Sequence, residues 1–297
     1  MPQKRIMEYC GVGKRVLAFF IDILCTLLIA INLNNYVFSN LTKERLGTTL
    51  LEEKYKERLV DSHLYIVKED GYCYSIDIIN QDNHMLEEEY IEYLEDNLLA
   101  FYLDEDFSCS NIEQYIELKK NNVDIFVLNS TTNEYEFITD ITNEQKLKFY
   151  KSAVTYSIDK VLINDNQIKE YLSDIMRNNI LSLGMSFMLS MFIFFLIVPL
   201  INKNRSTIGK YMFKIGVVDV NTKQILSRQQ LTLRFTILFF ETLISLMCYG
   251  GLLLISFALT IFTRHNSSLH DLACKSMPID LIAYSKEFEE EGELACQ

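Results

Sequence analysis

The feature that most constrains this chain is the run ILSLGMSFMLSMFIFFLIVPLI, residues 180–201, which contains no charged residue. A helix of this length is about 33 Å long, and the hydrocarbon core of a bilayer is about 30 Å thick. Length and composition together therefore predict a transmembrane helix. A soluble enzyme with an unusually apolar core is an alternative interpretation, and the uncharged run argues against it.

Two further apolar runs each contain one acid. The first extends from Val16 to about Leu33 and contains Asp22. Its basic start also resembles a signal peptide, but the internal acid and the lack of a small-residue cleavage site favour an uncleaved anchor. The other run, 235–262, contains Glu241. At 28 residues it can cross once as a tilted span or fold back at Gly250-Gly251, so the side of the C-terminus stays open.

Charge separates the apolar segments from a long acidic block. Residues 32–179 hold 14 Lys+Arg and 29 Asp+Glu, a net of −15, whereas the rest of the chain holds 14 and 11, a net of +3. Eleven of the 14 basic residues outside the block lie in the N-terminal tail and in 202–234, which predicts a cytoplasmic N-terminus and an external acidic block. No basic stripe with interleaved aromatics is present, so no nucleic-acid partner is expected.

The acidic block has patterns typical of a folded α+β domain. Segments 64–78 and 124–138 are β-prone runs around polar turns, the first at Asp70-Gly71, and predict hairpins. Residues 85–103 have helical spacing at Leu86, Tyr90, Ile91, Leu94 and Leu98, and residues 166–179 predict a helix leading into the second span. The predicted fold is an α-helical membrane domain of three to four transmembrane segments with an inserted extracytoplasmic α+β domain. The predicted ranges are 1–33 for the N-terminal tail and first helix, 34–179 for the insert, 180–282 for the rest of the membrane domain, and 283–297 for an acidic tail.

Cysteine and histidine usage gives little support to metal or enzyme chemistry. The 7 cysteines form no CxxC motif, so we expect no zinc site and no cofactor. Cys73 and Cys109 could pair if the acidic block faces an oxidising space. His270-Asp271 has no accompanying nucleophile motif, and Asp271 is expected to cap a helix or pair with an arginine. Gly209-Lys210 lacks the preceding glycine of a P-loop. Two interpretations of this segment remain: a basic juxtamembrane loop, or a phosphate contact made by Lys210 and Lys214.

Several motifs in the membrane segments together resemble the RDD family of membrane proteins. They are Arg15 and Asp22 in the first span, Thr207-Ile208-Gly209-Lys210, Val217-Val218-Asp219, Arg234, and Arg264 followed by His270-Asp271-Leu272-Ala273. The resemblance covers residues 12–33 and 180–282. It implies a membrane protein, with transport such as sodium/proton exchange proposed for some members. The long insert between the first two spans departs from the usual short loop and implies an additional function.

The charges in the apolar runs predict a polar cluster at the inner membrane edge. An ionised acid facing lipid costs about 2.5–3.5 kcal/mol at the bilayer centre, so Asp22 is expected to face other helices and to meet a cation from Arg234, Arg264 or Lys210. The cluster either fixes helix packing or binds and relays an ion. Its predicted members are Arg15, Asp22, Thr207, Gly209, Lys210, Arg234, Glu241, Arg264, His270 and Asp271.

These observations favour a multi-pass protein of a bacterial cell membrane, with the lipid bilayer as its main partner. The first hypothesis is a non-enzymatic membrane protein that anchors or assembles an outward-facing sensing or binding domain. The alternative is an ion or small-solute transporter that uses Asp22 and Glu241. Three spans are few for an alternating-access carrier, so the second hypothesis also requires a homo-oligomer or a membrane partner.

Overall fold

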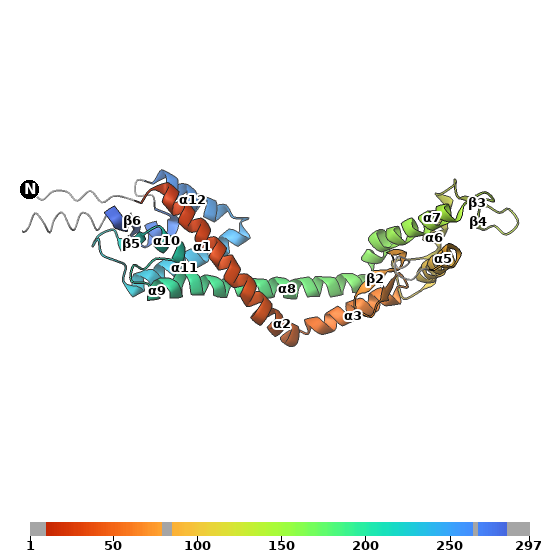
Figure 1. Cartoon of the computed structure of the whole chain (residues 1–297), viewed down its shortest axis with the longest axis horizontal. Helices are drawn as coiled ribbons and strands as arrows, with labels where there is room; N and C mark the ends of the chain where they lie inside the picture. Colours follow the sequence, from red (N-terminus) through yellow and green to blue (C-terminus); the bar gives the residue numbers. More distant parts are fainter. Residues whose placement is uncertain (1–9, 79–84, 264–266, 284–297) are drawn as a thin grey trace, which may run out of the picture. The chain divides into compact units, whose positions relative to one another are not determined.

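The computed structural model describes residues 10–78, 85–263 and 267–283 and divides the chain into two compact units. The membrane unit consists of residues 1–40 and 181–297, and the inserted unit consists of residues 41–180. Figure 1 colours the elements along the sequence, and each unit is described here by itself.

Within the part of the chain that the structure describes, three helices are long and apolar enough to cross a membrane. The first is α1, Val12–Leu33, which continues through a π-helical turn at Asn34–Phe38 into α2, Ser39–Arg45. The second is α8, Asn166–Phe192, which continues through a π-helical turn at Ile193–Ile197 into α9, Val198–Ile201. The third is α11, Arg228–Met247. The prediction that residues 166–179 form a helix leading into the second span is confirmed.

The third apolar run folds back on itself. Helix α11 ends at Met247, and α12, Gly251–Phe262, begins after Gly250, whose φ of 86° suits a glycine. The strand before α11 pairs with the strand that follows α12: β5, Ile215–Asp219, lies antiparallel to β6, Ser276–Asp280. Both ends of the run therefore meet in one sheet, which decides between the two alternatives that the sequence left open. At 12 residues, α12 is about 18 Å long and too short to cross a bilayer core alone.

Two short helices lie next to this sheet. They are α10, Ile208–Met212, and α13, Leu269–Ala273. Helix α10 packs against α1 and leads into β5, and α13 packs against α11 and α12 and leads into β6. Lys14 at the start of α1 contacts Asp280 of β6 with an Nζ–Oδ2 distance of 2.5 Å. The start of α1, the β5–β6 sheet and α13 thus belong to the same end of the membrane unit.

Small and polar residues join the first two long helices. The buried residues of α1 are Ala18, Asp22, Thr26 and Ala30, at four-residue intervals. On α8, the hydroxyl of Ser190 donates to the Thr26 carbonyl oxygen at 2.6 Å. Ser182 donates to the Asn34 side chain at 2.7 Å and Ser186 does so at 3.4 Å. Small residues and interhelical hydrogen bonds are how helices associate in lipid, where apolar burial supplies no driving force.

The inserted unit has a hydrophobic core of its own. Its helices are α3, Thr48–Asp61; α5, Glu87–Leu103; α6, Ile112–Lys120; and α7, Asn143–Tyr156. Both predicted hairpins are confirmed: β1, Tyr65–Val67, pairs with β2, Cys73–Ser75, and β3, Phe126–Leu128, pairs with β4, Tyr135–Phe137. Leu86 was predicted to share the buried face of α5 but precedes the helix and is exposed. The fully buried core side chains include Leu64, Ile76, Tyr90, Leu94, Leu98, Phe101 and Tyr150.

A buried ion pair closes the inserted unit where it joins α8. Arg58 of α3 donates from Nη2 to Asp165 Oδ2 at 3.0 Å and to the Asp106 carbonyl oxygen at 2.7 Å. Its guanidinium carbon lies 3.6 Å from the centre of the Phe107 ring. Asp165 in turn accepts the Ile168 backbone N–H at 3.0 Å and so caps α8. In the same unit, Cys73 and Cys109 are free thiols rather than the disulfide that remained open from the sequence.

Candidate functional site: a polar cavity in the membrane unit

The membrane unit contains a cavity of about 350 Å³. Its walls come from α1, α8, α11 and α12 and are largely apolar, whereas one end is lined by charged side chains. Of the ten residues predicted for the polar cluster, seven line the cavity, and Thr207 and Gly209 contact one of the seven. Arg264 lies outside the described residues. The seven are Arg15, Asp22, Lys210, Arg234, Glu241, His270 and Asp271.

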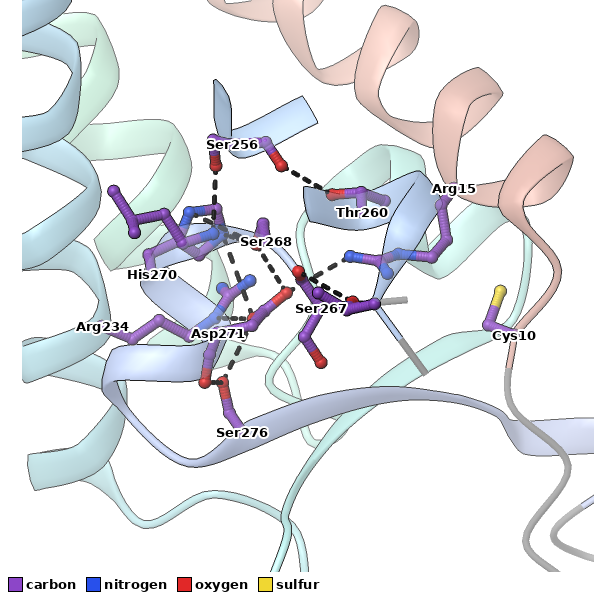
Figure 2. A network of polar contacts seen from close by, with 12 residues as sticks. Cys10, Arg15, Arg234, Ser256, Thr260, Ser267, Ser268, His270, Asp271 and Ser276 are labelled. Atoms are coloured by element: carbon purple, nitrogen blue, oxygen red, sulfur yellow. Dashed lines mark hydrogen bonds and ion pairs between the residues drawn. The ribbon is translucent and has the colours of Figure 1, made fainter. Parts of the chain in front are cut away.

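Asp271 is the centre of the charged network (Figure 2). Its Oδ1 accepts from Arg234 Nε at 2.9 Å, and its Oδ2 accepts from Arg15 Nη2 at 3.3 Å. The hydroxyls of Ser268 and Ser276 donate to the same carboxylate at 2.7 and 3.1 Å. Although burial raises the pKa of Asp271, the Arg234 guanidinium lowers it well below its usual value. Asp271 therefore joins α1 to α11 as an ionised bridge.

Among the described residues Asp22 forms no ion pair, so the expected pairing with Arg234 or Lys210 is wrong, whereas the third expected cation, Arg264, lies outside the described residues. Its Oδ2 accepts from Thr207 Oγ1 at 2.6 Å, and its Oδ1 accepts the Gly209 backbone N–H at 2.7 Å. Gly209 is in the first turn of α10, whose backbone N–H groups have no partner within the helix. Asp22 of α1 thus supplies from another helix the acceptor that an N-cap side chain ordinarily supplies.

Gly209 is required by the close approach of α10 to α1. A Cβ atom built on Gly209 would lie 2.2 Å from the Ala18 carbonyl oxygen and 2.7 Å from Asp22 Oδ1. The first contact is with backbone atoms, which cannot move aside cheaply. Any side chain at position 209 would therefore separate the two helices and the hydrogen bonds between them.

Glu241 and His270 form the second polar contact of the cavity. Glu241 Oε2 lies 3.1 Å from His270 Nδ1, and the Ser268 hydroxyl lies 3.0 Å from His270 Nε2. Glu241 is 3% exposed. Its other oxygen, Oε1, is buried and has no hydrogen-bond partner among the described residues. Burial lowers the pKa of His270, although the neighbouring Asp271 opposes this effect.

Two basic groups, Arg15 and Lys210, line the cavity. Arg15 Nη1 is buried without a hydrogen-bond partner in the described part of the chain, although Nη2 of the same side chain contacts Asp271. Lys210 lines the cavity, where burial and the nearby Arg234 lower the pKa of its ammonium to about 7. The residues at the charged end of the cavity therefore carry basic groups and one carboxylate oxygen without a partner among the described residues.

The sequence reasoning missed several polar residues of this site. Ser268 and Ser276 complete the shell around Asp271. Thr26 and Asn34 join the first helix to α8 beside the cavity through Ser182, Ser186 and Ser190. Only the four-residue spacing of Ser182, Ser186 and Ser190 was visible in the sequence as a signal. Within the described ranges no group of three or more His, Cys, Asp or Glu side chains has the arrangement of a metal site.

Comparison with known proteins gives a match to one family model over part of the chain and to no individual relative. The model of the RDD family matches residues 152–275. The match includes Thr207, Gly209, Arg234 and Asp271 and does not include the first span, where the motif of Arg15 and Asp22 was noted. No curated protein matches the chain. No solved structure matches it either.

Proposed function

Starting from a multi-pass membrane protein whose residues 152–275 match the RDD family, we propose that its membrane unit anchors an external binding or sensing domain formed by the inserted unit. In this proposal the N-terminus is cytoplasmic, because the N-terminal tail and residues 202–234 carry the basic residues. The β5–β6 sheet and α13 share that side, since Lys14 contacts Asp280 and Arg15 contacts Asp271.

One observation carries this proposal. The inserted unit has its own buried core, and its connections to the membrane unit are continuations of membrane-crossing helices, residues 12–45 and 166–201. A chain that leaves the bilayer on one helix and returns on the next has its insert on one side of the membrane. The basic residues of the N-terminal tail and of 202–234 support the external side for the insert, because short basic segments next to membrane helices are retained inside.

A non-enzymatic role is supported by the way in which the charges of the membrane unit are used. Among the described residues, Asp271 accepts from four side chains, and Asp22 accepts from one hydroxyl and one backbone N–H. Such contacts fix the relative positions of α1, α10, α11 and α13. The main role of the network is then to hold the anchor together.

The proposal is tested by separating the two units. Residues 41–180 expressed alone should be soluble, give a mixed α/β circular dichroism spectrum and unfold cooperatively. In intact cells, a cysteine introduced at Glu117, which is exposed, should react with a membrane-impermeant maleimide, whereas one at Lys275 should react only after lysis. A random-coil spectrum, or labelling of both positions from the same side, would contradict it.

An ion or small-solute transporter is the second candidate function. The observation that favours it is the buried Glu241 oxygen that lies at the cavity without a partner among the described residues. Intramembrane carboxylates with free coordination sites are typical of ion and proton pathways. Vesicle flux assays test this candidate: Asp22→Asn and Glu241→Gln should abolish cation/proton exchange at normal protein abundance. Equal flux in the variants and the wild type would remove it.

A further inference from the structure

Two polar groups of opposite sign at the cavity of the membrane unit lack a partner among the described residues, and a lysine lines the same cavity. Arg15 Nη1 and Glu241 Oε1 are buried without hydrogen-bond partners among the described residues, and Lys210 lines the same cavity. A buried polar group left unpaired costs about 1–3 kcal/mol, and more if it is charged. Two such groups on one cavity are therefore evidence for a molecule that pairs with them.

The signs of these groups restrict the chemistry of that molecule. Arg15 and Lys210 are donors and suit an anionic oxygen, whereas Glu241 Oε1 is an acceptor and suits an N–H or O–H donor. A bare metal cation would use only Glu241 and would be repelled by the two basic groups. A molecule with both a phosphate and an ammonium group uses all three.

The apolar walls restrict it further. Phe19 and Leu27 of α1 and Phe257 of α12 line the cavity and remain 44%, 43% and 43% exposed. Apolar lining residues of α1 and α12 are therefore also exposed on the outside of the helices, where a membrane has its acyl chains. A cavity of about 350 Å³ accommodates a headgroup with part of its glycerol, while the chains extend into the bilayer.

We propose that this cavity binds the headgroup of an aminophospholipid, with its phosphate on Arg15 and Lys210 and its ammonium on Glu241 Oε1. The proposal goes beyond anchoring, because it assigns a ligand to the membrane unit itself. It concerns equilibrium binding and makes no statement about flux.

Native mass spectrometry of the purified full chain in detergent tests the proposal, with three lipids of identical acyl chains as probes. Phosphatidylethanolamine has N–H donors, phosphatidylcholine has a quaternary ammonium without them, and phosphatidylglycerol has hydroxyl donors without a positive charge. The wild type should retain one phosphatidylethanolamine with at least tenfold preference over phosphatidylcholine, which corresponds to one hydrogen bond to a charged group. Equal retention of these two lipids would overturn the proposal.

Two variants assign the effect to this cavity. Glu241→Gln should reduce the preference for phosphatidylethanolamine over phosphatidylcholine about tenfold, and Lys210→Gln should weaken binding of all three lipids. Glu117→Gln, at an exposed acid of the inserted unit, is the matched control and should change nothing. An unchanged preference in Glu241→Gln would contradict the assignment.

A third variant covers the case in which a polar substitution fails to fold. Leu253→Phe adds volume at the apolar wall and removes no charged group. It should lower phosphatidylethanolamine retention while the elution volume and helical spectrum stay those of the wild type. Free O-phosphoethanolamine separates the two sources of this headgroup chemistry: if it competes as strongly as the whole lipid, the site takes a soluble zwitterion and the lipid assignment is wrong.

Discussion

Asp22 and Gly209 are 187 positions apart in the chain, and the Asp22 carboxylate accepts the Gly209 backbone N–H at 2.7 Å. A Cβ atom at position 209 would lie at that same distance from the carboxylate oxygen. The acid in the first helix and the glycine at the start of α10 are therefore parts of one contact. The absence of a side chain at 209 lets the helices approach, and the acid satisfies the backbone group that this approach buries.

The first prediction concerns this close approach. Gly209→Ala should destabilise the membrane unit by about 1–3 kcal/mol or more, because the added methyl group meets backbone atoms that must shift. Unfolding by increasing SDS, followed by circular dichroism, measures the effect. Gly184→Ala in α8 is the matched control: a Cβ atom there meets nothing within 4 Å, so its stability should equal or exceed that of the wild type. Equal stability of the two variants would contradict the packing described for α10.

The second prediction separates the charge of Asp22 from its hydrogen bonds. Asp22→Ala leaves the Gly209 N–H without an acceptor and should cost about 1–3 kcal/mol. Asp22→Asn should cost less, because its oxygen can still accept from Gly209 while the Thr207 hydroxyl turns to accept from the amide nitrogen. The same SDS titration compares them, and combining each with Thr207→Val gives the coupling between the two side chains. If Asp22→Asn were as damaging as Asp22→Ala, the negative charge itself would be essential.

The third prediction concerns the arginines at Asp271. Asp271→Ala leaves Arg15 and Arg234 buried without their shared carboxylate and should cost about 3–5 kcal/mol, the range for breaking a buried ion pair. Thermal stability of a fluorescent fusion on size-exclusion chromatography is a suitable measurement. The contrast is Lys14→Ala, which removes the Lys14–Asp280 pair, whose lysine side chain is 47% exposed. Lys14→Ala should have little effect on thermal stability. Similar losses of stability in the two variants would mean that burial of the ion pair does not determine its contribution.

The fourth prediction is a pH dependence of the inserted unit. Burial raises the pKa of Asp165. The hydrogen bonds from Arg58 and from the Ile168 N–H lower this pKa by more than burial raises it, so it lies below its ordinary value of 3.8. The contribution of Asp165 to stability is therefore fully present above pH 3.8 and is lost as the pH falls through the lower pKa of the folded state. Urea unfolding of residues 41–180 at pH 7 and pH 3 should reveal this loss.

The matched variant for this pH effect is Asp165→Asn. It should be less stable than the wild type at neutral pH, and the difference between the two proteins should shrink as the pH falls below 3.8. A constant difference across this range would mean that the Asp165 charge does not contribute through its pairing with Arg58.

The fifth prediction tests the contact between the first two long helices. Ser186 is fully buried and donates to the Asn34 side chain and to the Ser182 carbonyl oxygen. Ser186→Leu should separate α8 from α1, because the larger side chain meets a helix packed on small residues. Ser186→Ala keeps the small volume and should lose only about 0.6 kcal/mol, the average for a hydrogen bond between membrane helices. SDS titration distinguishes them, and a Leu variant as stable as the Ala variant would contradict this packing.

The sequence by itself determined the features that depend on local composition. Length and apolarity identified the membrane-crossing segments at 180–201 and after Val16, and alternation around polar turns located both hairpins of the insert. The cost of an acid in lipid correctly indicated that Asp22 is buried among other groups. These inferences succeeded because each depends on the free energy of transferring a short segment out of water. The residues of that segment alone set this free energy.

Tertiary structure decided what depends on partners far apart in the chain. Among the described residues the partners of Asp22 are a hydroxyl and a backbone N–H, and two arginines, Arg15 and Arg234, pair with Asp271. The third apolar run folds back because β6 returns to pair with β5, and residues that looked unremarkable, such as Ser268 and Ser276, complete the shell of a buried carboxylate. Several chemically similar donors could pair with each buried carboxylate, and differences of a few ångströms decide which of them does. Only the packing of the helices sets those distances.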